Sequence, residues 1–261
     1  MALCRFYNRS LLTSDQRDCI DVVLVSPRNP LNIGAVARAM ANFGFARLTV
    51  VAPYEPHWRE ARSAVGAPRL LTDAREVASL ADAVRECQLV IGTGTLTHRK
   101  PEQPAVQLDE LAPRVAQVLS QRSRVALVFG PEKHGLTRED LSWCHLLVEI
   151  PTDSRQPSMN LGQAAAVFLY EIATRFESVQ TANSRDRTTG PAPTTSGDLD
   201  ILGELIEEVM AEAKYSPKSM EGANRHDLRV MLRRLHLNAS DSRRALGLFR
   251  RILWRLRQNQ P

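Results

Sequence analysis

Short apolar, β-rich runs alternate with helical patterns along the first 176 residues of the chain. Such alternation is typical of α/β folds, in which each helix crosses over a parallel sheet and covers one of its faces. The sequence therefore predicts an α/β fold with a parallel sheet. The strand candidates are residues 20–25, 48–51, 89–91, 125–129 and 146–150, and the helical patterns cover residues 34–43, 75–85, 108–119 and 160–176.

Length and composition limit the class of protein. The chain has 261 residues, of which 43% are hydrophobic and 24% are charged, enough for one full domain and a smaller second piece. No apolar stretch approaches the roughly 20 residues that cross a bilayer, and residues 1–17 lack the apolar centre of a signal peptide. We therefore expect a soluble, cytoplasmic protein with a short N-terminal extension and no membrane partner.

The cysteines and histidines give no sign of a disulfide framework or a metal site. Cys4, Cys19, Cys87 and Cys144 form no CxxC pair, and no histidines cluster beside them. His98, His134 and His145 are scattered, so we expect them in loops or in the core. A dinucleotide site is excluded as well, because Thr93-Gly94-Thr95 lacks the third glycine of GxGxxG and its acidic partner.

The basic charge is concentrated near the C-terminus. The net charge of the whole chain is +5, but from Arg225 onward ten arginines stand against Asp227 and Asp241, a local charge of +8, which leaves −3 for the preceding 224 residues. Such a block is either a solvated helix surface or the footprint of a polyanion, and its density favours nucleic acid.

The basic block follows a segment of low complexity. Residues 177–200 hold almost no large apolar side chain, so their burial cannot offset the entropy of ordering them, and we interpret them as a flexible linker that would let the rest swing. Amphipathic patterns predict a small helical extension over residues 201–261. On its last helix, Arg244, Arg251 and Arg255 lie opposite an apolar stripe of Ala245, Leu248, Phe249, Ile252 and Leu256, after a cap at Ser240 or Asp241.

A polar tip lies where the first strand gives way to a helix. Residues 29–38 read Asn-Pro-Leu-Asn-Ile-Gly-Ala-Val-Ala-Arg, and from Ile33 onward apolar positions recur at helical spacing while Arg38 points off that stripe. With Asn32 and free backbone N–H groups at the helix start, Arg38 is well placed to hold an anion. By itself, the segment also fits a capped surface helix with a solvated arginine.

Two further strand ends carry glycine-rich or polar loops. Residues 127–136 end a buried strand in a Gly-Pro turn, where Gly130 would let a ligand approach the backbone, and set Glu132 in the loop that follows. Beyond Ile150, Ser158 and Asn160 offer a hydroxyl and an amide at the start of a helix. Sites in parallel sheets gather at the carboxyl ends of the strands, so we expect these segments to lie together.

Taken together and in this order, the three segments resemble the motifs of the SPOUT superfamily of S-adenosylmethionine-dependent RNA methyltransferases. The match is close to its TrmH-like branch, which methylates the ribose 2′-oxygen, and within it to the bacterial tRNA (cytidine/uridine-2′-O-)-methyltransferases, which modify position 32, the first nucleotide of the anticodon loop. The resemblance covers residues 21 to about 176, so that residues 18–176 would form the methyltransferase domain, and residues 201–261 a tRNA-binding extension.

The resemblance implies a parallel sheet with a C-terminal deep trefoil knot, S-adenosylmethionine as cofactor, tRNA as substrate, no metal, and a homodimer in which both subunits build each site. Asn32 and Arg38 match the first motif, Glu132 the second, and Ser158 and Asn160 the third, and these five are the expected catalytic residues. The cofactor would be held largely by backbone at Thr93, Gly94, Thr95, Gly130, Ile150, Pro157, Ser158 and Met159. The expected RNA-binding residues are Arg244, Arg251 and Arg255.

Two roles stay open for Arg38. The family proposal makes it a general base, but a guanidinium has a pKa above about 12 and is not readily deprotonated. It would instead bind the phosphate beside the target ribose and stabilise the developing alkoxide, with Ser158 and Asn160 orienting the ribose or the catalytic loop. Glu132 would either orient Arg38 or accept backbone N–H bonds in its own turn.

Two other functions also stay open. One is the same chemistry on ribosomal RNA. The other is a non-catalytic RNA-binding protein that kept the fold, and the intact set of Asn32, Arg38, Ser158 and Asn160 argues against it.

Overall fold

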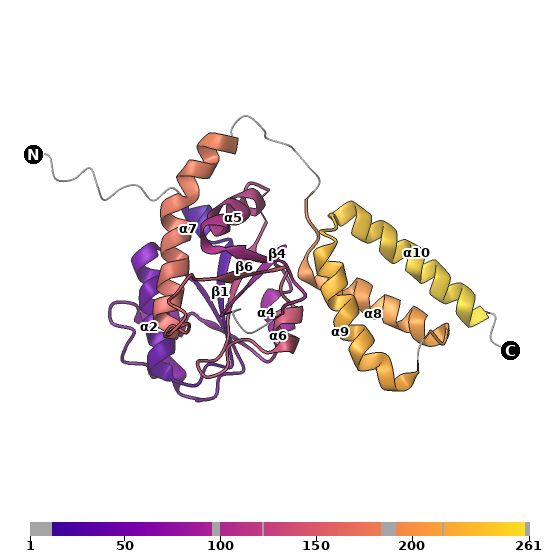
Figure 1. The fold of residues 1–261 in the computed structure, drawn as a ribbon, viewed down its shortest axis with the longest axis horizontal. Helices are drawn as coiled ribbons and strands as arrows, with labels where there is room; N and C mark the ends of the chain where they lie inside the picture. Colours follow the sequence, from indigo (N-terminus) through magenta and orange to yellow (C-terminus); the bar gives the residue numbers. More distant parts are fainter. Residues whose placement is uncertain (1–11, 96–99, 122, 184–191, 216, 259–261) are drawn as a thin grey trace, which may run out of the picture.

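The computed structural model describes residues 12–95, 100–121, 123–183, 192–215 and 217–258. Within them lies a seven-stranded parallel sheet with the strand order β3-β2-β1-β6-β4-β7-β5 (Figure 1). The strands are β1 (Ile20–Val25), β2 (Arg47–Val51), β3 (Arg75–Val77), β4 (Leu89–Thr93), β5 (Ala105–Gln107), β6 (Val125–Phe129) and β7 (Leu146–Glu149). The predicted α/β fold with a parallel sheet is confirmed.

Helices connect the strands and follow the sheet. They are α1 (Ser14–Arg17), α2 (Pro30–Phe43), α3 (Pro68–Thr72), α4 (Leu80–Val84), α5 (Leu111–Leu119), α6 (Arg138–Ser142), α7 (Leu161–Asn183), α8 (Ser196–Glu212), α9 (Glu221–Arg234) and α10 (Ala239–Gln258), with 3-10 turns η1 (Trp58–Glu60), η2 (Leu108–Glu110) and η3 (Lys218–Met220). Among the described residues, none of these helices combines the length and the apolar character that would let it span a bilayer.

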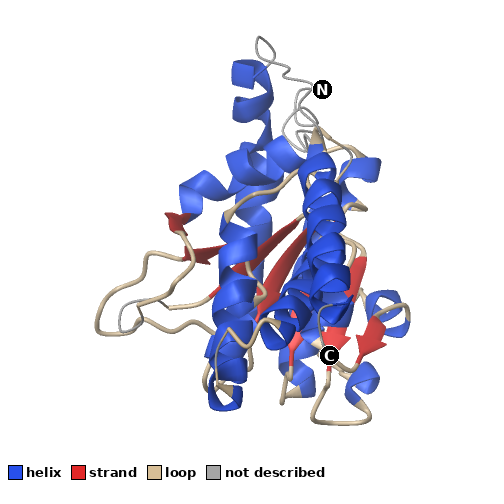
Figure 2. Ribbon diagram, turned by 90° about the vertical axis from the view of Figure 1, so that its right-hand side faces the viewer, coloured by secondary structure: helices blue, strands red, loops and turns tan. Residues whose placement is uncertain are grey.

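Alternate side chains of the strands build two apolar layers. In β1, Ile20, Val22 and Leu24 pack with α2, α5 and α7 on one face of the sheet, whereas Val23 and Val25 pack with α4 and α6 on the other. Figure 2 shows the sheet enclosed by helices in this way. Every residue of β1 is buried, so a site near this strand has to be built from the loops beyond its end.

The five predicted strands are confirmed to within two residues at each end. Two strands were missed. The predicted helix over residues 75–85 is wrong, because its first three residues form β3 and Ser79 caps a short α4 that begins at Leu80. β3 and β5 are three residues long, lie at the two edges of the sheet and have no buried side chain, so no apolar run marks them.

Helices α8, α9 and α10 form a separate cluster beside the sheet (Figure 1) with a small core of its own. Leu199 and Leu202 of α8 pack there against Leu228 and Leu232 of α9. The linker expected over residues 177–200 has narrower bounds in the structure. Helix α7 continues to residue 183 and α8 begins at residue 196, while residues 184–191 lie outside the described part of the chain.

The helical cluster is docked on the α/β part, which differs from the expectation that it swings. The ring of Trp143, at the end of α6, has the guanidinium of Arg229 4.0 Å and that of Arg233 5.0 Å from its centre. Arg233 is only 1% exposed and donates to the Trp143 carbonyl at 3.1 Å and to the Asp200 carboxylate at 2.8 Å. Arg229 also pairs with Glu139 of α6. Two arginines of the basic block therefore face inward.

The start of α8 is fixed to the α/β part by backbone contacts. The Ser196 N–H donates to the Cys87 carbonyl at 2.8 Å, and the Gly197 N–H donates to the Arg85 carbonyl at 2.9 Å. A Cβ atom on Gly197 would lie 2.8 Å from the Arg85 side chain, so this close approach favours glycine. The cluster is thus attached through both α8 and α9.

We expect Arg233→Ala to lower the free energy of unfolding by about 3 kcal/mol, because it leaves the Asp200 carboxylate, whose side chain is 22% exposed, without its buried partner. Burial raises the pKa of Asp200 even against the attraction of Arg233, and loss of the arginine raises this pKa further. When the pKa of a carboxyl group is higher in the folded than in the unfolded state, ionisation costs stability. This cost is complete above the folded-state pKa and disappears as the pH falls to the unfolded-state pKa. The difference in the free energy of unfolding between the parent and Arg233→Ala, measured by urea unfolding, should therefore shrink as the pH falls from neutrality through the raised pKa of Asp200.

The exposed neighbour Arg234 provides the control, since Arg234→Ala removes the same charge without touching Asp200. A deficit of Arg233→Ala that is the same at every pH would contradict the buried-carboxylate explanation.

Candidate active site

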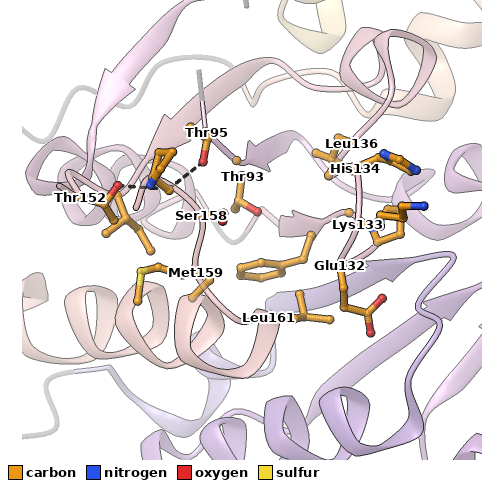
Figure 3. A pocket seen from close by; sticks show the side chains of 18 of the residues that line it. Thr93, Thr95, Glu132, Lys133, His134, Leu136, Thr152, Ser158, Met159 and Leu161 are labelled. Carbon is orange, nitrogen blue, oxygen red and sulfur yellow. Dashed lines mark hydrogen bonds between the residues drawn. The ribbon is translucent and has the colours of Figure 1, made fainter. Parts of the chain in front are cut away.

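Loops at the carboxyl ends of three neighbouring strands enclose a cavity of about 250 Å³. The loops follow β4, β6 and β7, and the beginning of α7 contributes the remaining wall (Figure 3). All eight residues expected to hold the cofactor line this cavity, namely Thr93, Gly94, Thr95, Gly130, Ile150, Pro157, Ser158 and Met159. The structure thus brings together strand ends that are far apart in the sequence.

The sequence misses the apolar wall of the cavity. Phe129, Leu136 and Phe168 line it, and the Phe129 and Phe168 rings meet edge to face with their centres 5.6 Å apart. These residues follow the same periodicity as the rest of the core, so no pattern distinguishes them. Thr152 also lines the cavity and could have been found, because it comes two positions after Ile150 at the same strand end.

Threonine hydroxyls fasten the loops to one another. Thr95 Oγ1 and Thr152 Oγ1 both donate to the Pro157 carbonyl, at 3.0 Å and 3.1 Å (Figure 3). Thr93 Oγ1 donates to the Val128 carbonyl at 3.0 Å. The cavity is therefore held in shape by bonds between the segments that line it.

Gly130 is required by the fold of its own loop. A Cβ atom at this position would lie 2.2 Å from the Leu136 nitrogen and 2.3 Å from the Gly135 carbonyl carbon. The loop after β6 folds back on Gly130 in this direction, while Gly130 also lines the cavity. The absence of a side chain at Gly130 is needed for the loop itself.

A chain of hydrogen bonds joins three of the five expected catalytic residues. Glu132 Oε1 accepts from the Asn32 amide at 2.9 Å, and Asn32 Oδ1 accepts from the Asn160 amide at 2.9 Å. Glu132 also accepts the backbone N–H groups of Arg28 and Asn29, both at 3.1 Å. Figure 3 shows its carboxylate turned away from the other labelled side chains of the cavity.

These bonds determine the charge of Glu132. Partial burial alone would raise its pKa, but the hydrogen bonds from Asn32, from its own N–H and from the N–H groups of Arg28 and Asn29 outweigh this and lower the pKa. The carboxylate is therefore ionised at neutral pH. Of the two roles that the sequence left open, the bond to Arg38 is not seen among the described residues. The other is seen in part, because the carboxylate accepts its own N–H but also accepts backbone N–H groups from the loop after β1.

The other two expected catalytic residues lie apart from this chain of bonds. Ser158 is exposed and lines the cavity two positions before Asn160, whose Oδ1 caps α7 by accepting the Gly162 N–H at 2.9 Å. Arg38 is exposed on α2 and makes no hydrogen bond or ion pair with any described residue. Its guanidinium is thus available to a ligand.

The three expected RNA-binding arginines lie on the outer face of α10. Arg244, Arg251 and Arg255 are all exposed, and the guanidinium of Arg251 lies 4.2 Å from the centre of the Trp254 ring. Two details of the prediction are wrong. Leu248 is 59% exposed and so does not belong to the apolar stripe, and the helix is capped by Asn238, whose Oδ1 accepts the Ser240 and Asp241 N–H groups at 2.9 Å.

The histidines and thiols of the described residues offer no acid, base or nucleophile in the cavity apart from His134, which lines it. His145 is buried beneath β4, where its Nδ1 accepts the Val90 N–H at 3.1 Å, and burial lowers its pKa. Burial raises the pKa of the Cys87 and Cys144 thiols to about 12. His98 and Cys4 lie outside the described residues.

One group of potential metal ligands lies between the helical cluster and the sheet. Glu102, His226 and Asp227 place their ligand atoms within 4.8 Å of one another. Arg138 donates to Glu102 at 2.7 Å and lies 3.8 Å from Asp227. The guanidinium of Arg138 thus already supplies the positive charge beside these carboxylates, and Glu102, His226, Asp227 and Arg138 form an ion-pair cluster.

Comparison with known proteins identifies the family. A model described as the SpoU rRNA Methylase family matches residues 20–170. The tRNA (cytidine/uridine/adenosine-2′-O-)-methyltransferase TrmJ of Pseudomonas aeruginosa (strain UCBPP-PA14) is 33% identical over 243 residues, which cover 90% of this chain and 93% of the relative. The tRNA (cytidine/uridine-2′-O-)-methyltransferase TrmJ of Pectobacterium atrosepticum is 31% identical over 237 residues, 90% of this chain and 95% of the relative.

Solved structures agree with this similarity. The crystal structure of TrmJ from Z. mobilis ZM4 superposes with a TM-score of 0.76 at 26% identity and covers 89% of this chain and 98% of that chain. The family match spans the sheet, the three loops and the cavity, and the similarity to TrmJ extends beyond them. The chain therefore belongs to the SpoU methylase family.

Proposed function

We propose that the protein transfers a methyl group from S-adenosylmethionine to the ribose 2′-oxygen of a cytidine or uridine in tRNA, at position 32 of the anticodon loop. The observation that carries the proposal is that Glu132 both lines the cavity and holds the Asn32–Asn160 pair. A cavity for the methyl donor and a polar cluster able to orient a ribose therefore adjoin. The TrmJ relatives, similar over 90% of this chain, support tRNA as the substrate.

The residues of the cavity fit an adenosyl cofactor. Phe129, Leu136 and Phe168 offer apolar contact to a flat base, while the hydroxyls of Thr152 and Ser158 and the backbone of three loops offer polar contacts. When bound, the cofactor supplies a methyl group on a positively charged sulfur. The residues that would hold it are the eight predicted ones together with this apolar wall and Thr152.

Arg38 would bind the phosphate beside the target ribose. As the 2′-oxygen gains the methyl group, the proton of its hydroxyl passes to solvent water, and the positive charge of the Arg38 guanidinium stabilises the negative charge that develops on the oxygen. Arg38 is assigned this role and not that of the base, because a guanidinium offers a planar fork of N–H donors to phosphate and alkoxide oxygens and has no acceptor atom. Asn32, Asn160 and Ser158 would orient the ribose, and Glu132 is a positioning residue that fixes Asn32.

Two features of the family are part of the same proposal. One is the deep trefoil knot, supported by the match of residues 20–170 to the SpoU methylase family. The other is a homodimer, supported by the exposed apolar side chains of Leu31, Met159 and Tyr170 beside α2 and α7.

Ribosomal RNA is the second candidate substrate, because the matching family is described as the SpoU rRNA Methylase family. That model ends at residue 170, however, whereas the tRNA methyltransferases match 90% of the chain and so reach into the helical extension. Incubation with labelled cofactor and either total tRNA or ribosomal RNA, followed by mass spectrometry of the nucleosides, distinguishes the two. A 2′-O-methylated pyrimidine at position 32 of tRNA is expected, and no methyl incorporation into any RNA would point to the non-catalytic alternative.

We expect Arg38→Ala to reduce methyl transfer by about 10² or more, as for the loss of one donor that stabilises the transition state. Because Arg38 is exposed and has no partner among the described residues, the melting temperature should stay nearly unchanged. Arg38→Lys should also be poor, since a lysine lacks the planar fork of a guanidinium. A fully active Arg38→Ala protein would remove this residue from the mechanism.

A substitution on α7 tests where the cofactor binds. Ala164 lines the cavity, so Ala164→Phe should reduce the affinity for S-adenosylmethionine about tenfold or more by filling it. Gln163→Phe adds the same ring at the adjacent exposed position, which does not line the cavity, and serves as the control. Equal affinities of the two variants by calorimetry would place the cofactor elsewhere.

The arginine face of α10 is tested by salt dependence. Replacing Arg244, Arg251 and Arg255 together by alanine should weaken tRNA binding. The plot of log affinity against log salt should flatten by roughly one unit or slightly less for each phosphate that the variant no longer binds. Arg257→Ala is the control on the same helix, since Arg257 already pairs with Glu208 and Glu212. An unchanged slope together with a changed mass by light scattering would show that this face packs against a partner subunit instead.

A further inference from the structure

An arginine and a tyrosine form an exposed pair next to the proposed active site. The guanidinium carbon of Arg28 lies 5.5 Å from the centre of the Tyr54 ring. Arg28 is exposed, and Tyr54 is 69% exposed, so most of the ring is open to solvent. Neither Arg28 nor Tyr54 is among the site residues expected from the sequence.

The fold presents this pair on two adjacent loops. Arg28 follows β1 and Tyr54 follows β2, and these strands are neighbours whose last residues, Val25 and Val51, are in register. The Tyr54 N–H donates to the Pro27 carbonyl at 3.2 Å, which joins the second loop to the first. Both side chains therefore project from backbone segments that are joined to each other at the carboxyl ends of β1 and β2.

Both loops leave the sheet through an unusual backbone conformation. Ser26 and Ala52, the residues directly after the two strands, have φ angles of +44° and +42°. A residue with a Cβ atom is strained in this left-handed region. An exposed cation–π pair is a weak interaction. The pair by itself does not compensate for the backbone strain that presents it, and such strain concentrates at functional sites.

The position of the pair relates it to the proposed reaction. The Arg28 N–H donates to Glu132 Oε2, and the other oxygen of the same carboxylate holds Asn32. One carboxylate therefore fixes both the Arg28–Tyr54 loop and the residue expected to orient the ribose.

We propose that the Arg28–Tyr54 pair binds an unpaired nucleotide of the RNA next to the methylated ribose, an inference that rests on the proposed function. The ring stacks on the nucleobase and the guanidinium holds a neighbouring phosphate, which together match the two chemical faces of a single-stranded nucleotide. The pair thereby selects RNA whose target lies in an unpaired loop. It does not contact the methyl donor.

The test compares the parent protein with Tyr54→Ala and Tyr54→Phe, using unmodified tRNA and S-adenosylmethionine. Loss of one stacked base by Tyr54→Ala should raise the KM and Kd for tRNA about 5- to 100-fold, with a smaller change in kcat and unchanged affinity for the cofactor. Tyr54→Phe should rescue most of this loss, because it keeps the ring. Arg28→Ala should flatten the salt dependence of tRNA binding by about one unit or slightly less, since the backbone N–H that bonds Glu132 remains.

Val65→Ala is the control, because Val65 is 66% exposed and belongs to no segment with an assigned role in binding. If Tyr54→Ala and Val65→Ala both bind and methylate tRNA like the parent, the pair has no role in RNA binding. If Tyr54→Ala lowers kcat alone, or if Tyr54→Phe fails to rescue, the ring does not act by stacking and the inference is wrong. Failure of the parent protein to methylate tRNA in the same assay would instead refute the proposed function.

Discussion

One carboxylate holds together the two loops on which the site depends. Glu132 belongs to the loop after β6, yet it accepts the N–H groups of Arg28 and Asn29 in the loop after β1 and the side-chain amide of Asn32 in the first turn of α2. The two strands are neighbours, so their loops begin side by side, but adjacency does not fix the shape of either loop. Three hydrogen bonds to an ionised acceptor do so, and charge-assisted bonds of this kind are about twice as strong as neutral ones.

The chemistry of the site follows from this arrangement. The buried Cys87 and Cys144 thiols hold their protons, burial lowers the pKa of His145 so that its imidazole stays neutral, and the Glu132 carboxylate is ionised and engaged in hydrogen bonds. Such groups position and do not exchange protons at neutral pH. The proposed rate enhancement therefore comes from orientation of the ribose and from the positive charge of Arg38.

The sequence predicts the sheet and the outline of the site better than the contacts within it. β1 and β6 are buried on both faces, so their apolar runs are strong signals, and parallel strands share one carboxyl edge, which allows loops far apart in the chain to be placed together. The partners of Glu132 could not be predicted, because three of its four donors are backbone N–H groups that carry no sequence signature.

The role of Gly130 was hidden for a similar reason, since the atoms that crowd it belong to the backbone of the same loop. Arg229 and Arg233 were counted in the basic block, but they turn inward onto Trp143, some 90 positions earlier in the chain. The helical periodicity of the sequence gives the face of a helix on which an arginine lies. Whether that face is exposed to solvent depends on the tertiary contacts of the helix.

The strand order also has a consequence for synthesis of the chain. β1, β2 and β3 can pair as soon as they emerge, but β4 pairs only with β6 and β7, and β6 ends 36 residues after β4. At typical translation rates β4 waits about 2–7 s for its first partner. During that interval a strand whose five residues are all buried in the finished fold has both edges open. The nascent chain is then most exposed to association with another strand, because an unpaired apolar edge is the usual template for it.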